Sequence, residues 1–99
     1  MWEAPLGIAT ADRRLALRVR VKTDGRFGDQ VCVRVRDRRV FGKTGEVAAD
    51  GTREAVVPFE SLVPADGSPV AIDAWCLDTR GRPGPFLVGE IALVRQGAP

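Results

Sequence analysis

Side chains that carry out catalysis are scarce in this 99-residue chain. It contains no His, no Asn and no Tyr, and its only serines are Ser61 and Ser68. Without His, no Ser–His or Cys–His nucleophile can be assembled, and the usual proton shuttle near neutral pH is missing. Zinc takes four ligands from Cys, His or carboxylate, so two Cys and no His argue against a zinc site. We therefore expect no enzymatic activity, no metal and no cofactor.

One short motif suggests phosphate binding. Residues 41–45 read Phe-Gly-Lys-Thr-Gly and contain the Gly-Lys-Thr of a phosphate loop. That loop requires a Gly five residues before its second Gly, where this chain has Asp37, and it requires a helix to follow. Neither condition is met, so we interpret the segment as a turn between strands.

Trp75 is the side chain best suited to binding a partner. Strand alternation gives it the same face as Asp73 and Leu77. If its strand pairs with the one near residue 33, Arg34 and Arg36 join that face, and a Trp rimmed by charges could dock a protein or a sugar ring. Two alternatives stay open. Cation–π contact with an arginine would make Trp75 ordinary surface packing; with the opposite phase, Trp75 and Leu77 are core and Asp73 sits at a strand edge.

The two cysteines lie on strands that we expect to be neighbours. Cys32 shares its phase with Arg34 and Arg36, whereas Cys76 shares its phase with the apolar Ile72 and Ala74. One sulfur therefore points outward and the other inward, although a bulge in either strand would reverse this conclusion. We expect two free thiols in a reducing compartment. The start of the chain has no basic, apolar leader, which also favours a cytoplasmic over a secreted protein.

Positive charge is concentrated in one part of the chain. Residues 13–39 carry ten basic side chains against three carboxylates, although the net charge of the whole chain is only +2. Arg suits bidentate recognition of phosphate or carboxylate, but a coding bias toward Arg explains the same composition. A small β-barrel could merge the arginines into one patch for nucleic acid or another polyanion. The residues of that patch would be Arg18, Arg20, Arg34 and Arg36.

The elements that must position these residues are extended. Apolar residues alternate with basic ones from Leu15 to Lys22 and from Val31 to Arg36, as in antiparallel strands with one face in water. Asp-Gly turns at 24–25, 50–51 and 66–67 and a Gly/Pro-rich loop at 80–85 separate the segments. Weaker strands are expected at 2–10, 39–48, 52–59, 69–78 and 86–94.

Six or seven short strands predict one all-β domain, an antiparallel two-sheet sandwich, with a small barrel as the alternative. The hydrophobic content of 44% is ordinary for a folded protein, and the apolar runs are too short to span a bilayer. Met1 directly before Trp2 looks more like a cut point than a natural start. One interpretation is a domain excised from a longer protein.

The order of these signals resembles a fibronectin type III domain. Leu62-Val63-Pro64, the following Asp-Gly turn and the strand from Val70 to Asp78 are similar to its second half, and Ala4-Pro5 with Leu15-Ala16-Leu17 to its first strands. The Tyr after the corner is absent and the second strand has no core Trp, so the wider immunoglobulin-like group is the better name. The resemblance implies a spacer, an accessory module or a binding module, including sandwiches appended to bacterial glycosyltransferases and glycoside hydrolases.

The leading hypothesis is a non-catalytic accessory or binding module. Its partner would be another domain of the same polypeptide, a second copy of the chain, or a carbohydrate. Binding would use the outer face of the sheet that holds the third, sixth and last strands, and replacing its anchor by Ala should abolish binding without unfolding the domain. The anchor and its polar rim would be Trp75, Arg34, Arg36 and Asp73.

Overall fold

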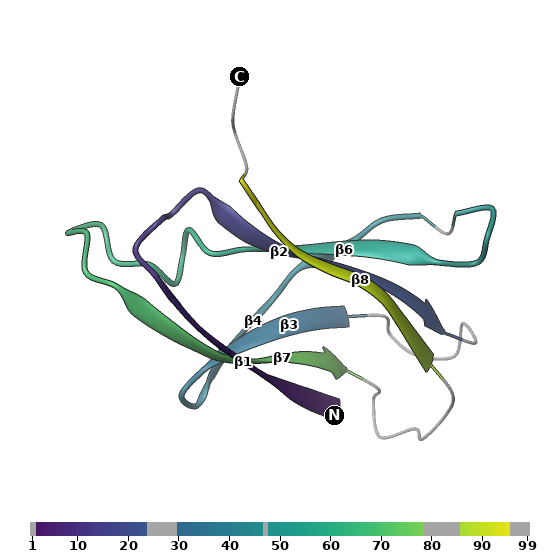
Figure 1. The fold of residues 1–99 in the computed structure, drawn as a ribbon, viewed down its shortest axis with the longest axis horizontal. Coiled ribbons are helices and arrows are strands. Elements are labelled where there is room, and N and C mark those ends of the chain that lie inside the picture. The colour runs from purple at the N-terminus through teal and green to yellow at the C-terminus, as the bar shows by residue number, and fades with distance from the viewer. Residues whose placement is uncertain (1, 24–29, 47, 79–85, 96–99) are drawn as a thin grey trace.

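The computed structural model describes residues 2–23, 30–46, 48–78 and 86–95, which form two four-stranded antiparallel sheets (Figure 1). Sheet A has the order β1-β7-β3-β4, and sheet B has the order β5-β6-β2-β8. The predicted all-β, two-sheet architecture is confirmed. None of the described residues belongs to a helix that is long and apolar enough to cross a membrane. The strands are β1 (Trp2–Thr10), β2 (Leu15–Thr23), β3 (Gln30–Val35), β4 (Arg38–Phe41), β5 (Lys43–Thr44), β6 (Arg53–Pro58), β7 (Val70–Asp78) and β8 (Phe86–Arg95).

Alternation along the central strands builds the core. In β2, Leu17 and Val19 face sheet A and are fully buried. Arg20 lies on the opposite face of the strand and is exposed to solvent. Val31 and Val33 of β3 meet them from the other sheet. Burying each such side chain contributes about 1.5–3 kcal/mol, so these alternating segments hold the two sheets together.

The predicted strand 39–48 is split between the two sheets at Gly42. β4 pairs with β3 in sheet A, and β5 pairs with β6 in sheet B. The Gly42 N–H donates to the Val31 carbonyl oxygen at 2.8 Å. A Cβ at this position would overlap the Val56 carbonyl oxygen and lie 2.7 Å from Val57 Cγ2. The Gly-Lys-Thr segment is therefore the crossing between the sheets, and Gly is needed because of the close backbone approach.

Two of the predicted Asp-Gly turns are confirmed. Asp50 accepts hydrogen bonds from the Thr52 N–H at 3.0 Å and the Thr52 hydroxyl at 2.6 Å, which lower the pKa of its carboxyl. Asp66 accepts one from the Ser68 N–H at 2.9 Å. The turn expected at 24–25 and the loop expected at 80–85 lie outside the described residues.

A change of phase in β7 decides which face Trp75 occupies. Ile72 and Trp75 both belong to the core, although an odd spacing of three residues separates them. Opposite this segment, β1 carries an extra residue between Pro5 and Ile8, and Gly7 there has a φ of 63°. This is the geometry of a β-bulge, which uncouples side-chain direction from sequence parity.

Trp75 is consequently a core residue with 3% of its surface exposed. It lies opposite Val33 of β3, and the ring of Trp2 packs edge-on against it at a centroid distance of 4.9 Å. The exposed position expected for Trp75 is wrong, and the alternative with Trp75 and Leu77 in the core is confirmed. Replacing Trp75 would therefore disturb the core, not a surface anchor.

The same change of phase overturns the prediction of two free thiols. It turns Cys76 to the outer face of sheet A, directly opposite Cys32 in the register of β3 and β7. Their Cα atoms are 5.0 Å apart and the two sulfurs form a disulfide. The bond joins neighbouring strands of one sheet, and both cysteines are fully buried.

The disulfide should contribute strongly to stability because it links residues 44 positions apart. Closing a loop of that length lowers the entropy of the unfolded chain, which raises the free energy of that state by about 4 kcal/mol at 25 °C. We expect the Cys32→Ala/Cys76→Ala variant to unfold at a much lower urea concentration than the oxidised protein. Equal midpoints, together with alkylation of both thiols in the untreated protein, would contradict the bond.

Candidate functional site

The four residues of the predicted docking face are not all brought together. Arg34, Arg36 and Asp73 meet at the end of sheet A where β3 turns into β4. Trp75 lies on the opposite face of the same sheet, inside the core. The last strand also lies elsewhere: β8 pairs with β2 in sheet B and not with β7. The predicted anchor is thus separated from its rim.

The three polar residues hold a strained hairpin turn. Val35 and Arg38 face each other, which leaves Arg36 and Asp37 as the two loop residues. Arg36 has a φ of 56°, a left-handed conformation that costs a non-Gly residue about 1–2 kcal/mol. Asp73 Oδ2 accepts the Arg36 N–H at 2.7 Å, and Arg34 Nη1 donates to the Arg36 carbonyl at 2.6 Å. The peptide of Arg36 is therefore held from both sides.

A hollow of about 440 Å³ lies beside this turn. Arg36 and Arg38 line it together with Asp37 and Asp73, so its charged groups balance. No aromatic ring of a described residue lines it, and a sugar would have no stacking surface there. This balance makes the hollow a weaker candidate than the apolar surface described below.

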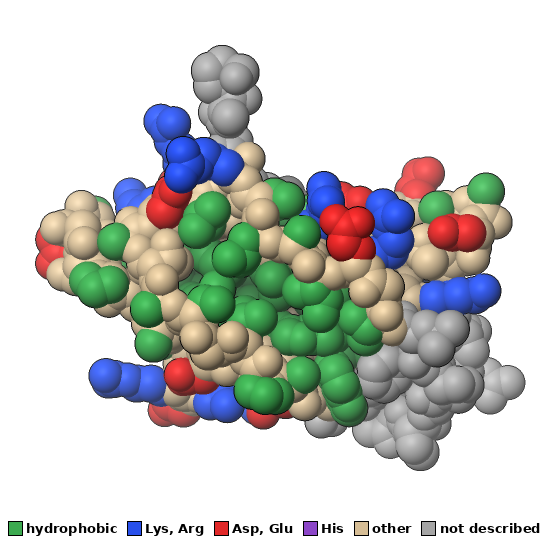
Figure 2. All heavy atoms as spheres, in the orientation of Figure 1, with side chains coloured by type: hydrophobic (Ala, Val, Ile, Leu, Met, Phe, Trp, Pro, Cys, Tyr) green, Lys and Arg blue, Asp and Glu red, His purple; other side chains and the backbone are tan. Residues whose placement is uncertain are grey.

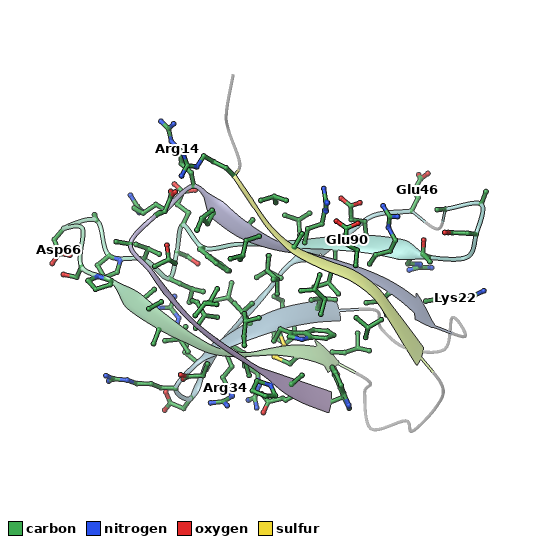
Figure 3. The ribbon with its side chains drawn as sticks, in the orientation of Figure 1. Arg14, Lys22, Arg34, Glu46, Asp66 and Glu90 are labelled. Atoms are coloured by element: carbon green, nitrogen blue, oxygen red, sulfur yellow. A yellow bond between two sulfur atoms is a disulfide. The ribbon has the colours of Figure 1, made fainter. Side chains whose placement is uncertain are left out.

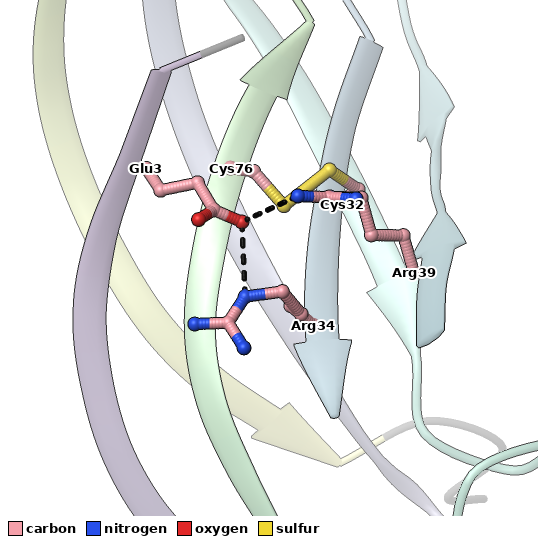
Figure 4. Close-up of a disulfide and its surroundings, with 5 residues drawn as sticks. All are labelled: Glu3, Cys32, Arg34, Arg39 and Cys76. Carbon is pink, nitrogen blue, oxygen red and sulfur yellow. Dashed lines mark hydrogen bonds and ion pairs between the residues drawn. A yellow bond between two sulfur atoms is a disulfide. The ribbon is translucent and has the colours of Figure 1, made fainter. Parts of the chain in front are cut away.

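The outer face of sheet A is occupied by an ion-paired cluster over the disulfide (Figure 4). Glu3 Oε2 lies 3.0 Å from Arg34 Nε and 3.3 Å from Arg39 Nη2. The carboxylate of β1 thus bridges two arginines from β3 and β4 across the buried Cys32–Cys76 bond. This arrangement links three strands, and the shared carboxylate leaves a net charge of one on the cluster.

The arginine row of β2 lies on the other side of the sandwich. Arg18 Nη2 pairs with Glu90 Oε1 at 2.7 Å, and Arg20 Nη2 lies 3.5 Å from Glu54 Oε2. Figure 3 shows Glu90 and Arg34 on opposite sides of the two layers. The merged patch of Arg18, Arg20, Arg34 and Arg36 that a barrel would give does not form, because β2 and β3 belong to different sheets.

An apolar surface lies where the sandwich is open. On one side the chain itself connects the sheets through Gly42, but on the other side the edge strands β1 and β8 leave inward-facing side chains uncovered. Ile91 and Leu93 lie opposite the core residues Val19 and Leu17, yet they are 41% and 47% exposed. We call this surface the open side; Figure 2 looks onto it and shows apolar side chains gathered there. It comprises Trp2, Leu6, Ile8, Ile91 and Leu93.

The two strands that border the open side differ at their free edges. In β1, Pro5 has no N–H to donate and the bulge at Gly7 distorts the ladder, two features that protect an edge from pairing. In β8, an extra residue opposite β2 ends the regular ladder near Gly89. From Glu90 to Arg95 β8 has no Pro. The regular part of β8 can therefore accept another strand.

Comparison with known proteins found no match: no family model, no curated protein and no solved structure is similar to this chain. The alternating pattern of β8 turns Ile91 and Leu93 toward the core, but it does not reveal that they are exposed. The alternation of apolar residues in β8 predicts only which way each side chain points. Which strand lies at a sheet edge depends on pairings across the whole chain.

The left-handed backbone conformation of Arg36 can be tested by substitution. Arg36→Gly should raise the free energy of unfolding by about 1 kcal/mol, because Gly adopts the left-handed conformation without strain. Urea unfolding measures the difference, and Arg38→Gly serves as the control because it has no positive φ to relieve. A loss of stability in Arg36→Gly would show that the turn is not strained.

Proposed function

We propose that this chain is a non-catalytic binding module that holds an extended apolar segment of a polypeptide on its open side. The observation that carries the proposal is the exposure of Ile91 and Leu93, whose side chains point toward sheet A and yet stay 41% and 47% exposed. Contiguous exposed apolar surface with a polar rim marks interaction sites in soluble proteins. The free edge of β8 adds backbone donors and acceptors, as in partners that bind by strand addition.

Polypeptide fits this surface better than sugar or nucleic acid. The expected stacking residue Trp75 is buried, and the hollow near Arg36 has no aromatic lining. Arginines on both outer faces pair with carboxylates, and their rows face opposite directions. A polyanion would therefore meet neither a continuous basic groove nor a row of stacking rings.

We further propose that the domain is related to immunoglobulin-like sandwiches. In support, β2 pairs with β6 and β3 pairs with β7, which correspond to the central B–E and C–F pairs of that fold. The edge strands differ: β1 lies beside β7 and β8 beside β2, whereas that fold places its first strand beside the second and its last beside the sixth. An accessory role in a larger polypeptide would agree with this relationship.

The disulfide changes the proposal for the compartment. Unpaired cysteines were one of the two reasons to expect a cytoplasmic protein, and Cys32 and Cys76 are bonded. Disulfides persist mainly in oxidising compartments. We propose that the domain works in such a compartment.

The test uses phage-displayed peptides of about nine residues, the length of one long strand. We expect selected peptides to show alternating apolar residues and to bind the protein with an affinity that Leu93→Asp lowers about tenfold or more, because the carboxylate would be buried without a partner. Fluorescence anisotropy of labelled peptides gives the affinities.

Phe41→Asp is the matched control, because Phe41 is 44% exposed but lies on β4, away from the open side. Its affinity for the peptides should equal that of the unmodified protein. Peptides that bind both variants and the unmodified protein alike would show that the open side is not the binding surface.

A further inference from the structure

We infer that the occupant of the open side is a second copy of this chain, bound by pairing β8 with β8. This inference rests on the proposed function and names its partner. β8 combines the two properties that such pairing requires: an edge with unbroken register from Ile91 to Arg95, and exposed apolar residues on one face. The other border of the open side, β1, is blunted by Pro5 and by the bulge at Gly7.

The alternation of β8 makes the strand complementary to itself. Two antiparallel copies related by a two-fold axis place facing residues on the same side of the new sheet. With the axis at Ala92, Ile91 lies opposite Leu93 of the second copy, and Leu93 lies opposite its Ile91. The two most exposed apolar residues of the strand thus cover one another, and the small Ala92 faces itself at the axis.

Charge favours this register over its neighbour. With the axis at Ala92, Glu90 faces Val94 of the second copy, so Glu90 keeps its ion pair with Arg18 and no like charges are opposed. With the axis moved to Leu93, the cation of Arg95 would lie against Ile91 on the apolar face. Ile91 would then lose its apolar partner, and the ion pair of Arg95 with Asp12 at 2.7 Å would lose contact with water. With the axis at Ile91 instead, Leu93 would face Gly89 and stay uncovered. The register centred on Ala92 is therefore the one in which Ile91 and Leu93 cover each other.

The resulting dimer has a continuous eight-stranded sheet made of two copies of sheet B. Pairing at β8 also brings the two open sides to the same axis, with Leu6 and Ile8 of β1 beneath the new strand pair. Apolar groups that one copy leaves in water are then covered by the other. Such an interface is isologous and closes after two copies, so no filament forms.

Cysteine cross-linking tests this register in the full chain. In an Ala92→Cys variant, the two introduced thiols would face each other directly, within reach of a disulfide under mild oxidation by oxidised glutathione. We expect a covalent dimer as the main species on non-reducing gels. Ile91→Cys and Leu93→Cys variants should cross-link to each other when mixed and much less when kept apart.

Two matched variants define the background. Val94→Cys lies on the same strand, but in the proposed register it faces Glu90 and is too far from its own copy to cross-link. Ala71→Cys lies exposed on β7, away from the open side. Circular dichroism before oxidation verifies that each variant is folded. We expect both controls to remain monomeric on the gel.

The outcomes separate this inference from the proposed function. Equal cross-linking of Ala92→Cys, Val94→Cys and Ala71→Cys would overturn the β8 register. No cross-link at Ala92, with selected peptides still binding in a Leu93-dependent manner, would overturn the second copy as partner and leave polypeptide binding in place. Loss of both results would overturn the proposed function as well.

Discussion

A two-layer sandwich buries its inward side chains only where each sheet extends far enough to cover the other. In this chain the central pairs β2–β6 and β3–β7 cover each other completely, which is why Leu17, Val33 and Trp75 are dry. At one side the polypeptide passes from sheet A to sheet B through Gly42, and a backbone crossing limits exposure there. At the other side β1 and β8 are the last strands of the two sheets in the part of the chain that the structure describes. The apolar surface of the open side follows from this unequal closure.

The arginine-rich composition has a structural explanation on the outer faces. Arg18 with Glu90 and Arg34 with Glu3 join neighbouring strands that are distant in sequence. Surface pairs of this kind contribute little stability each. They keep the outer faces of both sheets polar and reduce the repulsion between neighbouring arginines. The arginine rows thus leave the open side as the surface of distinct character, with an apolar centre and a charged rim.

Much of the fold could be predicted from local pattern, and the failures have one physical origin. The alternation of residues 15–22 and 31–36 placed β2 and β3 correctly because a regular strand couples parity to direction. The same parity rule failed at Cys76 and Trp75, since the irregular pairing around Gly7 and Ala74 changes the phase within β7. This bulge is set by the pairing of β7 with β1, and the residues of β7 alone do not reveal it.

The candidate site was less predictable for a related reason. Ile91 and Leu93 have the alternation of core residues, and their exposure arises because β8 pairs with β2 and is the edge strand of sheet B among the described residues. Arg34, Arg36 and Asp73 were correctly expected to lie close together. Their hydrogen bonds hold the turn at Arg36. This role depends on the left-handed backbone angle of Arg36, which these residue types do not predict.

Amide hydrogen exchange along β8 tests most directly whether a second copy of the chain covers the open side. Amides of residues 90–95 that do not bond to β2 should exchange more slowly as the protein concentration rises, because pairing protects them. This dependence should vanish in Leu93→Asp, while the amides of β3 stay equally protected in both proteins. Exchange at β8 that is independent of concentration in the unmodified protein would contradict pairing of β8 with a second copy.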